Sequence, residues 1–128
     1  MRRVSFLVMF GLAACGGGEI EIAGTWDTQF QTVETISSEK WNTATVVDFD
    51  NDGNTAITQS PADDMYTPNK FAKVVWLEPA GNSFYYCTVD YGRDTLEAAK
   101  TSTKTAEGTN PDATGCGGFP WSKLTKKQ

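Results

Sequence analysis

The stretch VVDFDNDGNTAI, residues 46–57, matches the first half of a calcium-binding loop, with acidic residues at alternate positions and then a glycine. The matching residues are Asp48, Asp50, Asp52 and Gly53. Calcium takes about six to eight oxygen ligands, and the twelfth position of such a loop supplies a bidentate glutamate. Here that position is Gln59, and the flanking residues alternate in polarity as strands do. The sequence therefore favours a β-hairpin turning at NDGN, and a weak calcium site at the three aspartates is the alternative.

Catalytic motifs are absent from the sequence. Without a single histidine, the chain has no Ser-His-Asp or Cys-His arrangement and no histidine-based metal site. Two carboxylates could hydrolyse a glycoside, but sixteen acidic residues create such pairs by chance, and Asp63-Asp64 is the only adjacent one. We therefore expect neither enzymatic activity nor a cofactor.

The first fourteen residues, MRRVSFLVMFGLAA, have the form of a secretory signal. Two arginines precede an apolar run from Val4 to Ala14 and a small-residue cleavage site. The run is about half the roughly 20 residues that a membrane-spanning helix needs. We expect residues 1–14 to be removed.

The sequence LAAC at 12–15 resembles the lipobox of bacterial lipoproteins. In such proteins the cysteine carries diacylglycerol and becomes the first residue of the mature chain, which implies acylation of Cys15 and a glycine-rich tether at 15–19. An ordinary signal cleaved near Ala14 is the alternative. Gly16, where an aspartate would favour retention in the inner membrane, points to the outer membrane or the cell surface.

Charge limits the partners of the mature chain. After the signal is removed, nine basic residues face sixteen acidic ones, giving a net charge of −7. Such a surface repels nucleic acid and anionic lipid. We expect contact with the membrane through the anchor and an unknown small ligand or protein as partner.

Cys87 and Cys116 are the two cysteines left once Cys15 is assigned to lipid. In an exported protein, two such cysteines are expected to form a disulfide, whereas two free thiols are the alternative.

Alternating apolar residues predict strands at 20–30, 41–49 and 55–59, with Trp26 and Phe30 on the buried side of the first. Branched and aromatic residues predict a hairpin of 70–78 and 83–91 around PAGN, in which Phe84 and Tyr86 face opposite to Cys87. Asp94 is predicted to cap a short helix near residues 94–101, and FPWSKL is expected to form the last strand.

These elements predict one mainly β domain over residues 20–128. It is a small antiparallel β-barrel or sandwich of six to seven strands. The barrel is favoured because a closed sheet leaves no exposed edge strand. Most aromatic residues are expected in the core. Trp76 and Trp121 are the better candidates for exposure and for contact with a ligand or partner, because apolar residues flank them on both faces.

Three stretches resemble an uncharacterised family of small exported proteins, mostly lipoproteins, from predatory and social soil bacteria. They contain YYC at 85–87, EAA at 97–99 and GCGGF at 115–119, shortly before Trp121. The resemblance implies paired cysteines and a lipid anchor but no activity. Gly24-x-Trp26 also resembles the first-strand motif of lipocalins, and the size and paired cysteines are similar to those of membrane-bound lysozyme inhibitors.

The leading hypothesis is a lipid-anchored cell-envelope domain with a non-catalytic binding or structural role. The first alternative is an inhibitor of an extracellular or periplasmic hydrolase acting through the loop at 60–69. The second is a weak calcium-binding surface protein.

Overall fold

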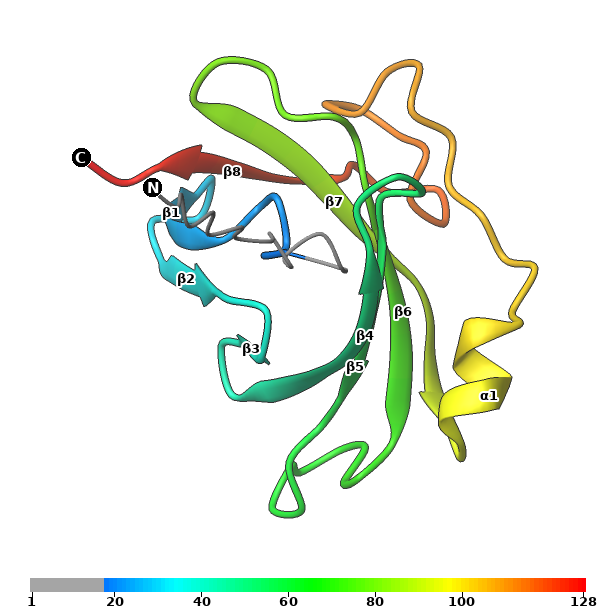
Figure 1. Cartoon of the computed structure of the whole chain (residues 1–128). Helices are drawn as coiled ribbons and strands as arrows, with labels where there is room; N and C mark the ends of the chain where they lie inside the picture. The colour runs from blue at the N-terminus through cyan, green and yellow to red at the C-terminus, as the bar shows by residue number, and fades with distance from the viewer. Residues whose placement is uncertain (1–17) are drawn as a thin grey trace, which may run out of the picture.

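A computed structural model describes residues 18–128, which form eight strands and one short helix (Figure 1). The elements are β1 (Gly24–Thr28), β2 (Val33–Ile36), β3 (Lys40–Trp41), β4 (Ala44–Asp50), β5 (Thr55–Gln59), β6 (Phe71–Trp76), β7 (Ser83–Arg93), α1 (Leu96–Lys100) and β8 (Ser122–Lys126). Within residues 18–128, no helix is long and apolar enough to cross a membrane.

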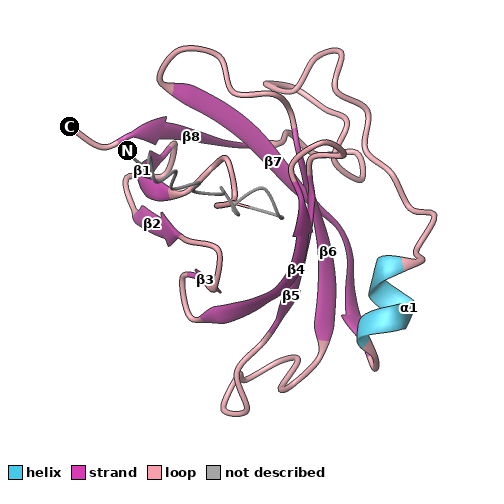
Figure 2. Ribbon diagram, in the orientation of Figure 1, coloured by secondary structure: helices cyan, strands magenta, loops and turns pink. Residues whose placement is uncertain are grey.

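Every strand pairs antiparallel with the next along the chain, and β8 returns to pair with β1, so that the sheet closes into a barrel. The expected barrel is confirmed, but it has eight strands rather than six or seven. The two that sequence patterns missed are β2 and β3, which are joined by a single residue pair, Ile36 and Trp41. Figure 2 shows how short these two strands are beside β4 and β7.

The barrel has two different ends. We call the end with the turns at 37–39, 51–54 and 77–82 the closed end, and the opposite end, with the turn at 29–32 and the loop at 60–70, the mouth. In Figure 1 the 60–70 loop lies at the bottom and the β6–β7 turn at the top.

Aromatic side chains fill the interior. Trp26 packs edge-on against Phe84 with ring centroids 4.7 Å apart, and Trp41 packs in the same way against Tyr86 at 5.0 Å. The buried cluster also contains Ile36, Val46, Ala56, Val74, Trp76 and Leu124. An eight-stranded barrel has just enough room for such side chains, so this interior is a packed core.

Residues 20–23 close the barrel before β1 begins. Ile20 and Ile22 are fully buried in the core cluster. The Ile20 N–H donates to Ser38 Oγ, and Asn51 accepts the Glu21 N–H while its own amide donates to the Glu19 carbonyl. This segment is thereby fixed to two turns of the closed end.

One detail of the predicted alternation is wrong, and one strand contains a bulge. Phe30 is exposed, because the chain turns after β1 ends at Thr28. In β4, a bulge between Val46 and Asp48 changes which residues face inward, so that Val46 is buried and Phe49 packs against the core. An extra residue in one strand shifts the alternation by one position.

The helix α1 packs on the outside of the barrel, against β5, β6 and β7 (Figure 1). Ala99 is its buried residue. The predicted helix near 94–101 is confirmed, but its N-cap is Thr95, whose side chain accepts from the Ala98 N–H, rather than Asp94.

The connection from α1 to β8, residues 101–121, crosses the outside of the barrel as a loop (Figure 2). The predicted disulfide is present between Cys87 and Cys116, whose Cα atoms lie 5.7 Å apart. Cys87 faces opposite to Phe84 and Tyr86 on β7, as predicted, and the two aromatic side chains are the ones that pack with the core. The disulfide fixes the middle of this connection to the barrel wall.

Gly115 lets the same connection fold over Trp121. Its φ of +107° is rare for residues with a side chain, and a Cβ there would lie 1.9 Å from the Glu107 carbonyl oxygen. Its carbonyl accepts from the Glu107 N–H, and the Glu107 carbonyl accepts from the Trp121 indole. Only glycine fits this close approach.

Removal of the disulfide should destabilise the fold. The two cysteines are 29 residues apart, and cross-linking a loop of this size contributes about 3.5 kcal/mol to the free energy of unfolding. Urea denaturation should show a loss of that order in Cys87→Ala/Cys116→Ala. Wild type measured with a reductant serves as a second comparison. Equal unfolding free energies for all three samples would contradict this account.

Candidate functional site

At the mouth, the barrel wall is shorter at β8 than at β7. Pairing between β7 and β8 stops at Tyr86 and Ser122, whereas β7 continues beside β6 to Arg93. The last part of β7 therefore extends beyond the start of β8. This difference in strand length gives access to the interior at the mouth.

A small pocket of about 170 Å³ lies in the mouth. Its lining residues are Glu34, Trp41, Asn42, Ala44, Thr58, Val74, Tyr86 and Thr88. The half-buried Glu34 carboxylate accepts two hydrogen bonds, from Trp41 Nε1 at 2.9 Å and from the Tyr86 hydroxyl at 2.8 Å. The pocket thus combines the Glu34 carboxylate, which two hydrogen bonds fix in place, with the aromatic rings of Trp41 and Tyr86.

Tyr86 remains a hydrogen-bond donor. Burial raises the pKa of its hydroxyl far above the ordinary value, and the negative charge of Glu34 raises that pKa further. The hydroxyl therefore stays protonated at neutral pH. Among the described residues, no ion pair involves Glu34.

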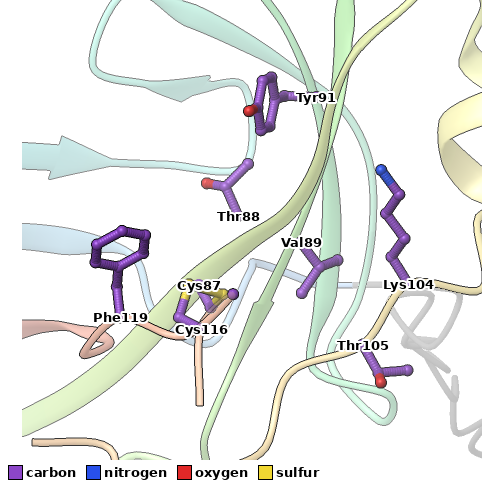
Figure 3. Close-up of a pocket in the computed structure, with 9 residues that line it drawn as sticks. Cys87, Thr88, Val89, Tyr91, Lys104, Thr105, Cys116 and Phe119 are labelled. Atoms are coloured by element: carbon purple, nitrogen blue, oxygen red, sulfur yellow. A yellow bond between two sulfur atoms is a disulfide. The ribbon is translucent and has the colours of Figure 1, made fainter. Parts of the chain in front are cut away.

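A larger groove of about 500 Å³ lies on the outer face of β7, beside the mouth (Figure 3). The disulfide lies in its floor, with Val89 beside it. Phe119 stands on one side and Lys104 on the other, as Figure 3 shows. The groove is thus bounded by the connection that follows α1.

Large apolar side chains are exposed around the mouth and along this groove. We call them the mouth rim: Phe30, Val33, Met65, Tyr66, Tyr91 and Phe119. Met65 and Tyr66, at the tip of the 60–70 loop, are 80% and 85% exposed. Four of them come from the turn at 29–32, the start of β2 and the loop at 60–70, all at the mouth, which makes this end the candidate interaction site.

Asp64 shapes the tip of the 60–70 loop. Its carboxylate accepts from the backbone N–H of Thr67 at 2.7 Å and of Tyr66 at 2.9 Å. These two hydrogen bonds lower the pKa of the Asp64 carboxyl, that from Thr67 most. The loop also bonds across its base, where the Asn69 N–H donates to the Pro61 carbonyl. Its conformation is therefore set by its own sequence.

A buried carboxylate, Asp90, paired with two partly exposed cations, holds the connection after α1 against β7. Asp90 is only 2% exposed, and its carboxylate lies 3.4 Å from both Arg93 and Lys104. A hydrogen bond from the Ser102 hydroxyl lowers the pKa of Asp90 most, and the two cations lower it further. Lys73 on β6 also donates to the Ser102 carbonyl, at 2.9 Å. One wall of the groove depends on these contacts.

Replacement of Asp90 should remove a pH-dependent part of the stability. Because its folded-state pKa lies below the ordinary value of about 3.9, the carboxylate stabilises the fold above that pH, and this contribution is lost as the pH falls through the folded-state pKa. Asp90→Asn should therefore unfold at lower urea than wild type at neutral pH, and the difference should shrink in acid. A difference that stays constant from neutral pH into acid would contradict this assignment.

The calcium alternative gains no support from the aspartates at the β4–β5 turn. Asp48 forms an ion pair with Lys100 at 2.9 Å, and Asp50 accepts from the Asp52 N–H within the turn. Within residues 18–128, no three acidic, histidine or cysteine side chains are grouped so that they could hold a metal ion. The predicted hairpin is confirmed, since Asp50 pairs with Thr55 across it.

The expected exposure of two tryptophans is wrong. Trp76 is 3% exposed, and its indole donates to Glu21 at 2.7 Å. Trp121 is 2% exposed beneath the connection that contains Glu107. Neither side chain is on the surface as predicted, because a distant segment covers each. Cys15 lies outside the described residues.

Sequence patterns missed the mouth pocket and its rim. Glu34 lies two positions before Ile36 and therefore on the same inward side of β2. A single carboxylate beside a core residue was the only sign in the sequence that Glu34 faces the interior. The short β2 gave too little alternation to reveal that side. The loop at 60–69 was predicted as a candidate inhibitory loop, but the sequence did not single out Met65 and Tyr66 within it.

No protein-family model, curated protein or solved structure matches this chain. The structure shows an eight-stranded antiparallel β-barrel, and these comparisons identify no family for the chain.

Proposed function

We propose that this protein is a lipid-anchored binding domain of the cell envelope, on the outer membrane or cell surface, and that it catalyses no reaction. The observation that carries the proposal is the mouth rim, a set of exposed apolar side chains at one end of the barrel. Aromatic residues and methionine on a surface favour contact with a partner. A purely structural role would not need such side chains in water.

The anchor and the rim belong to opposite ends. Residues 19–21 are bonded to the turns of the closed end. Cys15 and Glu19 are four residues apart and can be separated by at most about 14 Å, so a lipid on Cys15 would keep the closed end near the membrane. The mouth would then face away from the lipid, where a partner has access.

The filled interior argues against a large enclosed ligand. Pockets for drug-sized molecules have volumes of about 300–1,000 Å³, whereas the mouth pocket has about 170 Å³. We infer that the partner docks on the rim and that only a small group enters the barrel.

The 60–70 loop favours a second candidate, an inhibitor of an extracellular or periplasmic hydrolase. An inhibitory loop must present its tip in a preformed shape, since ordering a loop on binding weakens affinity. Asp64 shapes this tip, and Met65 and Tyr66 project from it. The proposed kinship with small exported lipoproteins is compatible with either function and rests on the three stretches described above.

Cys15→Ser should release the protein from membranes, because the serine hydroxyl cannot carry the thioether-linked diacylglycerol. Cell fractionation and immunoblotting should find this variant in the soluble fraction and wild type in the membrane fraction. Cys87→Ala/Cys116→Ala is the matched control and should stay with the membrane. Membrane association of Cys15→Ser would overturn the proposed anchor.

A photo-crosslinker at the rim should trap the partner. With p-benzoylphenylalanine in place of Tyr66, irradiated cells should yield a discrete adduct of higher mass, because this side chain projects from the mouth. The same group in place of Asn82, an exposed residue of the closed end, should yield none.

The trapped protein distinguishes the two candidates. A hydrolase that is slowed by the purified barrel would favour the inhibitor, and an unaffected protein would favour a binding role alone. Identical adducts at both positions, or none at position 66, would contradict docking at the rim.

A further inference from the structure

Glu34 presents a charge inside the mouth that its own neighbours do not neutralise. Its carboxylate is half-buried, and the two groups bonded to it, the Trp41 indole and the Tyr86 hydroxyl, are both neutral. The five ion pairs among the described residues all lie elsewhere. A carboxylate partly withdrawn from water gains most from a cation.

The carboxylate also has unused acceptor capacity. An ionised carboxylate accepts about four hydrogen bonds, and the protein supplies two. Because these donors hold one bond to each oxygen, the group is fixed in place before any ligand arrives. Such preorganisation reduces the entropy lost on binding.

The other lining residues also suit a cation with an aliphatic stem. Trp41 and Tyr86 contribute aromatic surface, which attracts cations and packs against methylene groups. Thr58 and Thr88 are further polar residues of the lining. A volume of about 170 Å³ admits a side-chain-sized group but not a larger ligand.

We propose that the mouth pocket binds an alkylammonium group, with Glu34 as its counter-ion. This proposal rests on the proposed function in one respect: a partner docked on the rim can supply the ammonium group as a lysine side chain. A free aliphatic amine offers the same chemistry. The negative net charge of the chain, −5 over the printed sequence, also favours a cationic ligand.

The test uses the Trp41 indole N–H as a reporter, because it donates to Glu34. The full chain carrying Cys15→Ser, labelled with ¹⁵N at tryptophan, is titrated with n-butylammonium chloride at constant ionic strength. We expect a saturable shift of the Trp41 indole resonance. The neutral isostere n-butanol should give no saturable shift.

Glu34→Gln should weaken butylammonium binding about tenfold or more, because a hydrogen bond to a charged group contributes about 1.5–3 kcal/mol. Glu39→Gln, at an exposed glutamate outside the pocket, is the matched control and should bind as the parent does. Thr88→Trp fills the pocket from an exposed position and should also abolish binding, which keeps the test valid if Glu34→Gln does not fold. Equal affinity in Glu34→Gln, or an equal response to butanol, would overturn the proposal.

Two further ligands identify the source of the amine. A blocked Gly-Lys-Gly peptide that binds at least as tightly as butylammonium supports a lysine of a partner, whereas binding of butylammonium alone supports a small free amine. Failure of both overturns the cation site. Rim crosslinks that persist without amine binding refute this inference alone, and amine binding without rim crosslinks refutes docking at the rim alone.

Discussion

The barrel depends on four buried tryptophans with bonded indole N–H groups, of which three bond to segments that close or cover it and one, Trp41, bonds to strand β2. The pairs are Trp26 with the Ile22 carbonyl, Trp41 with Glu34, Trp76 with Glu21, and Trp121 with the Glu107 carbonyl. Without an acceptor, a buried indole N–H would lower the free energy of unfolding by about 1–3 kcal/mol. Each tryptophan therefore fills space and also fixes the segment that supplies its acceptor.

This arrangement decides what kind of binding the domain can perform. Two of the four tryptophans hold residues 20–23 in the closed end, so that end is unavailable to a ligand. Trp41 instead bonds to Glu34, and the space left beside that pair is small. Under the proposed function, recognition therefore takes place mostly on the outside, at the rim and the neighbouring groove, with a single small group admitted at the mouth.

Local sequence patterns predicted the parts of the fold that local chemistry determines. The β6–β7 hairpin and β5 were predictable, because branched and aromatic residues flank clear turn residues. The burial of Trp76 and Trp121 was not, because their acceptors lie 55 and 14 residues away in the chain. Glu34 was missed for a similar reason: its partner Tyr86 comes from a strand 52 residues further on. Local sequence patterns could not predict this site, because its residues come together only in the closed barrel.

Hydrogen exchange of the indole groups tests the central claim most directly. After transfer of the tryptophan-labelled protein into D₂O, all four indole N–H resonances should remain protected, because every one is buried and bonded. Immediate loss of the Trp76 or Trp26 signal would show that residues 20–23 do not close the barrel. Such a result would contradict the assignment of a closed end and an open mouth.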